Sequence, residues 1–281
     1  PELPEVERAR RLVEDSCAGR QIVACEALED LKVLQNGLSS AGFQAALVGR
    51  RLDACHRRGK LFWWELDGGA VPSPLFHFGM TGAMVVQGVG AMEYKSFSVD
   101  DSSWPPRFWK FHCEFEGGVK LAFVDSRRFG KVWVQDDPPA QAPINKLGFD
   151  PLLDMPDLQL FTALLGRRRG AIKGILLDQA FSAGVGNWVA DEVLYQARVH
   201  PEARAEELSE VQVAAVHAAV RDVIKIACDC NAASEGFPPG WIFHARWTGK
   251  KASKTAAGES ISFITVGGRT SAFVPGLQKK G

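Results

Sequence analysis

The chain has 281 residues, of which 46% are hydrophobic and 23% are charged, and its formal net charge at pH 7 is zero. These values predict a soluble globular protein with one large domain or two ordinary ones, each with its own core. They exclude an integral membrane protein, because no stretch approaches the roughly 20 apolar residues that a spanning helix needs. The neutral balance also argues against a nonspecific polycation.

The start of the chain and its cysteines favour an intracellular protein. The first five residues show no signal-peptide pattern, and we expect Pro1 to be the mature, processed end. The cysteines, at positions 17, 25, 55, 113, 228 and 230, follow no disulfide spacing and include no CxxC pair, which is typical of reduced thiols. Metal binding by Cys228 and Cys230, which one residue separates, is the less favoured alternative.

The first half of the chain is predicted to be a helix followed by strands. Val6, Ala9 and Val13 recur at helical spacing and predict a helix over 4–16. From about residue 20 to 135, short runs rich in β-branched and aromatic residues alternate with glycine-containing turns, which predicts an antiparallel β-sandwich. The clearest of these runs are 61–66, 83–86 and 119–124.

The second half is predicted to be mainly helical. Its start is marked by the proline-rich segment 136–143, because proline extends neither a helix nor a central strand. Apolar residues then recur at helical intervals over 158–165, 171–180, 188–197 and 211–226, and 241–281 look irregular and strand-like. The predicted parts are therefore a β-sandwich domain (1–135), a linker (136–148), a helical domain (149–240) and a β-hairpin segment (241–281).

Three separated segments, 50–60, 167–173 and 241–281, each carry a net positive charge. On a neutral chain, such clusters favour a single face that binds phosphates. The alternative, which the composition leaves equally open, is that each cluster is solvated surface.

Proline at position 1 is a candidate nucleophile. An α-amine has a pKa of about 7.7–8.0, so much of it is neutral near physiological pH. Because Pro1 is a secondary amine, its attack on an electrophilic sugar carbon would give a cationic iminium that acts as an electron sink. The adjacent Glu2 can carry protons. Taken alone, removal of an initiator methionine is the more common explanation of such a terminus.

Two further patterns point to phosphate binding. Lys60 opens the apolar run 61–66 beside a glycine, where its ammonium can reach a phosphate, although a surface lysine is the common alternative. A helix is expected to end near Phe181. After the turn that follows, Gly184 and Gly186 precede Asn187, the expected N-cap of the next helix. Such a helix N-terminus offers N–H donors to a phosphate, although an ordinary helix hairpin would look the same.

Two glycine-flanked segments carry candidate wedges for a base stack. In 125–130 a predicted strand delivers Arg127 and Phe129 to a turn, where a guanidinium can bond an orphaned base and a ring can enter the stack. In 77–82, Met80 is a second apolar candidate. Taken alone, Met80 and Phe129 would each more often be a core residue.

Together these motifs resemble the formamidopyrimidine-DNA glycosylase / endonuclease VIII family. The similarity lies in Pro-Glu-Leu-Pro-Glu-Val-Glu at 1–7, Arg-Arg-Gly-Lys at 57–60, His-Phe-Gly-Met-Thr-Gly at 77–82, Asp-Ser-Arg-Arg-Phe-Gly at 125–130 and Gly-Val-Gly-Asn at 184–187. These motifs occur in the family's order and span nearly the whole chain. The opening residues and the arginine at 269 are more similar to the formamidopyrimidine branch.

The resemblance implies an α+β fold: a β-sandwich with a leading helix, then a helical domain with a helix–two-turn–helix, then a C-terminal β-hairpin finger. It implies a bifunctional DNA glycosylase and abasic-site lyase that excises oxidised purines from damaged double-stranded DNA. It also implies roles for ten residues. The catalytic residues are Pro1 as Schiff-base nucleophile, Glu2 as proton carrier and Lys60; the DNA-binding residues are His77, Met80, Arg127, Phe129, Lys173, Asn187 and Arg269.

The sequence departs from the family pattern in two places. No cysteine follows Cys230, so the four-cysteine zinc finger of many members is absent and the segment 262–274 is similar to the zincless fingers of plant and fungal members. We expect no metal or cofactor, and expect packing of Ile264, Val266, Phe273 and Val274 to replace the metal. The segment Asn231–Trp241 is also shorter than in bacterial members, which predicts weak activity on 8-oxoguanine.

Two other functions compete with this interpretation. One is a nucleic-acid-binding module without catalysis, against which the Pro1–Glu2 pair argues. The other is a small-molecule isomerase that uses Pro1 as a base, which would not need three basic clusters. We further expect a monomer without membrane association, located in the nucleus if the source is eukaryotic and in the cytoplasm otherwise.

Overall fold

The computed structural model describes residues 1–89, 102–248 and 252–281. Contacts within the chain divide it into two compact units. The first unit comprises Pro1 and Glu5–Lys146, and the second comprises Glu2–Pro4 and Leu147–Gly281. The helix α1 (Leu3–Cys17) therefore starts in residues of the second unit and continues in the first.

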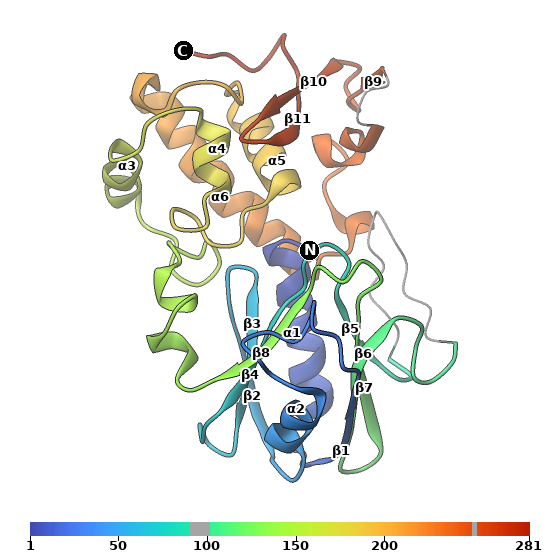
Figure 1. The fold of residues 1–281 in the computed structure, drawn as a ribbon. Coiled ribbons are helices and arrows are strands. Elements are labelled where there is room, and N and C mark those ends of the chain that lie inside the picture. Colours follow the sequence, from blue (N-terminus) through green and yellow to red (C-terminus); the bar gives the residue numbers. More distant parts are fainter. Residues whose placement is uncertain (90–101, 249–251) are drawn as a thin grey trace. The chain divides into compact units, whose positions relative to one another are not determined.

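The first unit is the predicted antiparallel β-sandwich (Figure 1). One sheet has the order β1-β6-β7-β5 and the other the order β2-β3-β4-β8, and every pairing within them is antiparallel. The strands are β1 (Ile22–Ala27), β2 (Leu52–Arg58), β3 (Leu61–Leu66), β4 (Ser73–His77), β5 (Ala83–Val86), β6 (Trp109–Phe115), β7 (Val119–Val124) and β8 (Lys131–Gln135). The predicted runs 61–66, 83–86 and 119–124 are β3, β5 and β7, so these predictions are confirmed.

The core of this unit is aromatic. Trp64 and Phe76 from one sheet pack near Phe111 of the other, with ring centroids 5.0 and 5.6 Å apart for Trp64–Phe76 and Phe76–Phe111. The helix α1 contributes its apolar stripe, including Val6 and Val13, to the same core, as does α2 (Ser40–Leu47) through Phe43 and Leu47. Burial of these side chains drives the sandwich together, since each large apolar side chain contributes about 1.5–3 kcal/mol when fully buried.

The second unit is helical, with a hairpin at its C-terminal end. The helices are α3 (Leu158–Gly166), α4 (Ile172–Leu177), α5 (Asn187–Ala197) and α6 (Glu210–Asp229). Short 3-10 turns are η1 (Pro138–Ala140) and η2 (Ile144–Lys146) in the first unit, and η3 (Ala205–Glu207), η4 (Ser234–Gly236), η5 (Ile242–His244) and η6 (Arg246–Thr248) in the second. None of the helices in the described ranges is both long and apolar enough to cross a bilayer.

Two predicted helix boundaries were wrong. The helix expected over 171–180 and ending near Phe181 ends at Leu177, because Asp178 is extended and its carboxylate accepts a hydrogen bond from the Ala180 N–H at 2.9 Å. This local turn replaces continued helix. Asn187 is the first residue of α5 and not its N-cap, which is Gly186.

The predicted β-hairpin finger is confirmed. It consists of β10 (Ser260–Val266) and β11 (Arg269–Phe273), with β9 (Ser253–Lys254) along its outer side. Val266 pairs with Arg269, so Gly267 and Gly268 form a two-residue turn, and their φ angles of 60° and 72° fit the turn that such hairpins favour. Glycine adopts these angles without strain.

The apolar contacts of the finger differ in part from the expected set. Val266, Phe273 and Val274 are buried, but Ile264 is only half-buried. The cluster that holds the hairpin instead comprises Tyr195, Ile242, Ile261, Ala272 and Val274. A side chain of α5 and the η5 turn thus provide part of the packing that the sequence pattern assigned to the hairpin alone.

Candidate active site and nucleic-acid interface

The turn between β2 and β3 contains Lys60. Arg57, near the end of β2, has only 3% of its surface exposed. Its Nε donates to Glu7 Oε2 at 2.9 Å and its Nη1 donates to the Gly59 carbonyl at 2.9 Å. One buried guanidinium therefore joins α1 to the backbone of the turn and fixes the residue before Lys60.

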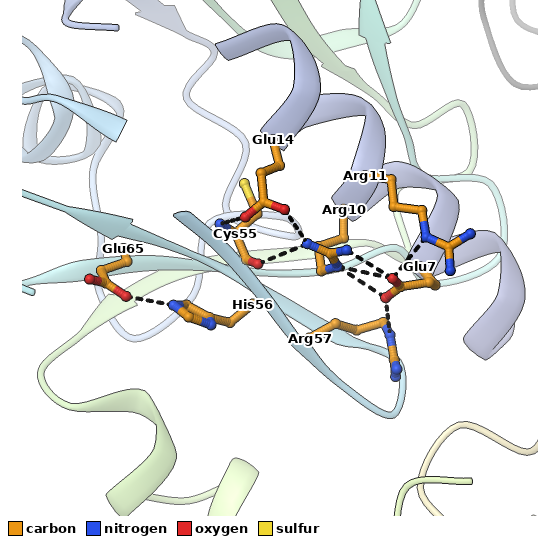
Figure 2. Close-up of polar contacts among 8 residues, drawn as sticks. All are labelled: Glu7, Arg10, Arg11, Glu14, Cys55, His56, Arg57 and Glu65. Carbon is orange, nitrogen blue, oxygen red and sulfur yellow. Dashed lines mark hydrogen bonds and ion pairs between the residues drawn. The ribbon is translucent and has the colours of Figure 1, made fainter. Parts of the chain in front are cut away.

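Glu7 is the centre of this network (Figure 2). Besides Arg57 it accepts hydrogen bonds from Arg10 and Arg11, and Arg10 also donates to Glu14 at 2.6 Å. Burial alone raises the pKa of Glu7, but the hydrogen bonds from Arg10 and Arg57 outweigh it, so the pKa lies below its ordinary value. The carboxylate therefore stays ionised and holds the turn in place.

His77 lies near two other predicted residues of the first unit, Lys60 and Pro1. It ends β4, where it pairs with Leu61 of β3 and Lys131 of β8, and its Nδ1 accepts a hydrogen bond from the Gly79 N–H at 3.1 Å. Burial, followed by the nearby charges of Lys60, the Pro1 amine and Lys131, lowers the pKa of His77 to about 4. The imidazole is therefore neutral at pH 7, and with Nδ1 accepting, its proton lies on Nε2, where it can be donated to a ligand.

Two loops beside these residues are joined by Asp125, which is completely buried. Its carboxylate accepts from the Thr81 hydroxyl at 2.5 Å, from the Gly130 N–H at 2.7 Å and from the Arg127 N–H at 3.3 Å. Thr81 belongs to the 78–82 loop and the other two donors to the 125–130 loop. The loops also touch directly, because a Cβ on Gly79 would come within 2.5 Å of the Phe129 backbone.

This bracing leaves apolar side chains in solvent. Met80 is 51% exposed and Phe129 is 50% exposed, and the Arg127 guanidinium lies over the Phe129 ring at 5.0 Å from its centroid. The neighbouring Arg128 instead makes a bidentate ion pair with Asp30 at 2.8 Å. The Arg127 side chain is thus exposed, whereas Arg128 holds the turn through Asp30.

In the second unit, the Glu2 carboxylate lies at the N-terminus of α5. It accepts from the N–H groups of Gly186 at 2.9 Å, Trp188 at 2.8 Å and Val189 at 3.1 Å. A helix N-terminus attracts an anion because its first N–H groups lack partners within the helix. A Cβ on Gly186 would come within 2.4 Å of Glu2 Cδ, so glycine is required here for the carboxylate to approach.

Leu3 fixes the same end of the chain. It is completely buried in the core of the helical unit, and its N–H donates to the Gly184 carbonyl at 3.1 Å. Gly184 has a φ of 103°, and a Cβ there would meet the Leu3 side chain at 2.6 Å. The predicted 184–187 motif therefore contacts both Glu2, through the Gly186 N–H, and Leu3, through the Gly184 carbonyl.

The finger hairpin lies against the start of α5. Asn187 Nδ2 donates to the Thr270 carbonyl at 3.0 Å, and Lys173 Nζ donates to the same carbonyl at 3.2 Å. Arg269 directly precedes Thr270 and is exposed. The predicted residues Glu2, Asn187 and Arg269 thus gather at one end of α5.

The expectation that Lys173 contacts a phosphate was wrong. Its side chain has no exposed surface, and its Nζ lies 2.7 Å from Asp191 Oδ1 and donates to Ser271 Oγ at 2.6 Å. Burial lowers the pKa of Lys173, which the charge of Asp191 partly offsets. The Lys173 ammonium therefore contacts Asp191 and the β11 strand of the hairpin, and so it stabilises the hairpin.

Asp191 is a buried hub that sequence reasoning missed. Besides Lys173 it pairs with Arg246, whose Nη2 donates to Oδ2 at 2.7 Å, and Oδ2 also accepts from the Ala272 N–H at 3.1 Å. It therefore connects α4, α5, η6 and β11. A charged residue on the apolar face of a predicted helix was the signal that could have found it. Sequence reasoning also missed that Arg57 and Asp125 hold the neighbouring loops in place, although both lie within the motifs 57–60 and 125–130.

Several residues of the three basic clusters make ion pairs within the protein. Arg50 pairs with Asp67, Arg51 with Asp53 and Arg168 with Asp178. Lys250 and Lys251 lie outside the described residues. Among the residues that the structure describes, no three His, Cys, Asp or Glu side chains are grouped as metal ligands.

Comparison with known families covers almost the whole chain. Residues 1–132 match the formamidopyrimidine-DNA glycosylase N-terminal domain, 147–237 the H2TH domain of the same enzymes and 241–275 the formamidopyrimidine-DNA glycosylase-like C-terminal domain. The chain is similar to formamidopyrimidine-DNA glycosylase of Arabidopsis thaliana, with 44% identity over 281 residues, or 99% of this chain and 71% of the relative. It is 30% identical to that of Pelotomaculum thermopropionicum, over 99% of both chains.

Solved structures agree with these matches. The fold is similar to Lactococcus lactis formamidopyrimidine-DNA glycosylase bound non-covalently to DNA with an abasic site, with a TM-score of 0.80, 26% identity and 99% coverage of both chains. It is equally similar to MutM in complex with DNA containing carbocyclic 8-oxoguanine, with a TM-score of 0.80, 26% identity and 99% coverage of both chains.

Proposed function

Since this chain belongs to the formamidopyrimidine-DNA glycosylase family, we propose how its own residues carry out the family's reaction. The protein is a DNA glycosylase with abasic-site lyase activity that removes oxidised purines in base excision repair. Its partner is damaged double-stranded DNA. A binding module without catalysis and a small-molecule isomerase, the two alternatives from the sequence, do not fit a match that extends through all three enzyme domains.

The 78–82 and 125–130 loops serve to open the duplex. A base inside a duplex cannot reach a catalytic group, so it must leave the stack. Met80 and Phe129, each about half exposed, are available to fill the vacated space, and Arg127 can hydrogen-bond the orphaned partner base. Asp125 keeps both loops rigid, so little order has to be imposed when DNA binds.

Pro1 and Glu2 perform the chemistry. The Pro1 nitrogen attacks C1′ of the sugar, the bond to the base breaks, and Glu2 delivers a proton to the ring oxygen as the sugar opens. The iminium then acidifies the C2′ proton, and elimination breaks the strand first on the 3′ side and then on the 5′ side. This assignment rests on one observation: three backbone N–H groups donate hydrogen bonds to the Glu2 carboxylate. These bonds fix the position of Glu2, the residue bonded to Pro1.

Lys60, His77, Asn187 and Arg269 are proposed to bind the phosphates around the extruded nucleotide. Lys60 and Arg269 bring positive charge, whereas neutral His77 brings a hydrogen-bond donor. Each phosphate neutralised by a lysine or arginine releases counterions, so binding weakens steeply as salt rises.

We also propose a substrate order and a setting for the reaction. The short segment Asn231–Trp241 favours ring-opened formamidopyrimidines over 8-oxoguanine. We propose that the enzyme acts as a monomer without a membrane, in the nucleus of a eukaryotic cell or the cytoplasm of a bacterial one.

Borohydride trapping tests the nucleophile. Reduction of the iminium should give a covalent adduct with DNA that contains a formamidopyrimidine. Adding one glycine before Pro1 turns its amine into an amide, and trapping should then fall by at least about 100-fold, because an amide nitrogen is not nucleophilic. Lys60→Arg removes the competing primary amine while keeping the charge, and it should still trap. Trapping that survives the extension but is lost in Lys60→Arg would assign the nucleophile to Lys60.

A further inference from the structure

Two cysteines of the first unit face each other across neighbouring strands. Cys25 of β1 and Cys113 of β6 are direct partners in the antiparallel register. Both thiols are free, and the two side chains interact with each other. Neither residue takes part in the proposed glycosylase chemistry, so the pair needs an explanation of its own.

The backbone spacing of the pair suits a disulfide. The Leu28 N–H donates to the Lys110 carbonyl at 2.8 Å, which makes Leu28 and Lys110 a hydrogen-bonded pair. Because such pairs alternate along an antiparallel ladder, Cys25 and Cys113, three positions along, form a non-hydrogen-bonded pair. The Cα atoms of such pairs lie about 4.5 Å apart. That spacing falls at the short end of the range of roughly 4.4–6.8 Å that disulfides span.

Access to solvent differs between the two thiols. Cys25 is half-buried on β1, which is the edge strand of its sheet, whereas Cys113 is only 1% exposed. A small oxidant can therefore reach Cys25 first. Cys113 is then the only thiol placed directly opposite it in the strand register.

We propose that Cys25 and Cys113 form a redox modification site, at which a peroxide converts the two thiols into a cross-strand disulfide that joins β1 to β6. The Cys25 thiolate attacks one peroxide oxygen, the O–O bond breaks, and Cys25 becomes a sulfenic acid as water leaves. The Cys113 sulfur gives up its proton and attacks the Cys25 sulfur, and the S–O bond breaks with loss of a second water. Two thiols and one hydrogen peroxide thus become one disulfide and two waters.

The other thiols of this unit are poor competitors. Cys17 and Cys55 are buried, with exposed fractions of 0% and 3%. Burial raises the pKa of Cys17 to about 12 and the pKa of Cys55 and of Cys113 well above its ordinary value, so none of these three thiols reacts with the oxidant first. Cys113 differs from the other two because it lies directly opposite Cys25 in the strand register. The disulfide should therefore form selectively.

Mass spectrometry of the full-length protein tests the site. Treatment with a small excess of hydrogen peroxide should remove two hydrogens, and peptide mapping without reduction should find Cys25 linked to Cys113. Dithiothreitol should reverse the change. Cys25→Ser should abolish it, whereas Cys230→Ser, a change at another half-buried cysteine, should leave it intact.

The outcomes separate clearly. A peroxide-treated protein in which Cys25 carries only sulfenic or sulfinic acid, or in which the cross-link persists in Cys25→Ser, would overturn the proposal. Since the disulfide constrains the unfolded chain, the oxidised protein should also melt at a higher temperature than the reduced one. Cleavage of abasic-site DNA should change by less than about twofold, and this readout is independent of the nucleophile assignment.

Discussion

The two units place their ligand-facing residues in similar ways but on differently charged supports. In the first unit the buried Asp125 holds loops that expose apolar side chains, and all its donors are neutral: two backbone N–H groups and a hydroxyl. In the second unit the buried Asp191 holds the finger hairpin, and two of its partners are the cations Lys173 and Arg246.

This difference sets what each unit loses when its aspartate is removed. Without Asp125, neutral donors lose an acceptor, which costs about 1–3 kcal/mol for a buried group. Without Asp191, two cations stay buried without a counter-charge, and breaking a buried ion pair from one side costs about 3–5 kcal/mol. A neutral support is thus more tolerant of change than an ionic one.

The largest effect is expected for Asp191→Ala. The free energy of unfolding should fall by about 3–5 kcal/mol, and the finger should become sensitive to protease. Urea unfolding and limited proteolysis measure these changes. The matched control is Asp229→Ala, which removes an exposed partner of Lys225 and should leave stability nearly unchanged. Equal losses in the two variants would show that the hub is not what holds the finger.

A smaller loss, about 1–3 kcal/mol, is expected for Asp125→Asn, because the amide can no longer accept from both the Thr81 hydroxyl and the Gly130 N–H. Base extrusion should slow, as measured by the fluorescence of 2-aminopurine opposite the lesion. Phe129→Ala is the informative comparison, since it removes an exposed ring and should slow extrusion without lowering stability. If Asp125→Asn destabilised the protein as much as Asp191→Ala, the contrast between neutral and ionic supports would fail.

The last comparison lies in the pH dependence of stability, where the two units should have slopes of opposite sign. Burial lowers the pKa of His77 from 6.5 to about 4, so the unfolded chain binds more protons between these values and stability falls as pH drops from 6.5 to 4. Burial raises the pKa of Glu192 from 4.5 to about 7, so its contribution is present below pH 4.5 and is lost as pH rises to 7.

Each slope can be removed separately. His77→Gln should reduce the fall in unfolding free energy between pH 6.5 and 4. Glu192→Gln keeps an acceptor for the Phe243 N–H and should reduce the loss between pH 4.5 and 7. Urea titrations at a series of pH values measure both. Slopes that match the wild type in either variant would mean that another group titrates there.

The sequence by itself determined the antiparallel β-sandwich, the hairpin finger and the strands β3, β5 and β7, because these depend on patterns within a few neighbouring residues. Short runs rich in β-branched and aromatic residues, separated by glycine turns, indicate β3, β5 and β7. Gly267 and Gly268 define the finger turn in the same local way. The motifs also located Pro1 and Glu2, whose proposed roles follow from their own chemistry.

Only the tertiary structure decided which charged residues face a ligand and which face the protein. Arg127 and Arg128 are neighbours in one motif, yet only Arg128 meets Asp30, a partner almost a hundred residues away. Lys173 was expected at a phosphate but is ion-paired with Asp191. The partner of a charged side chain is fixed by long-range packing, and burying a charge is tolerated only where that partner is present. A pattern within a few neighbouring residues cannot identify a partner that lies far away in the sequence.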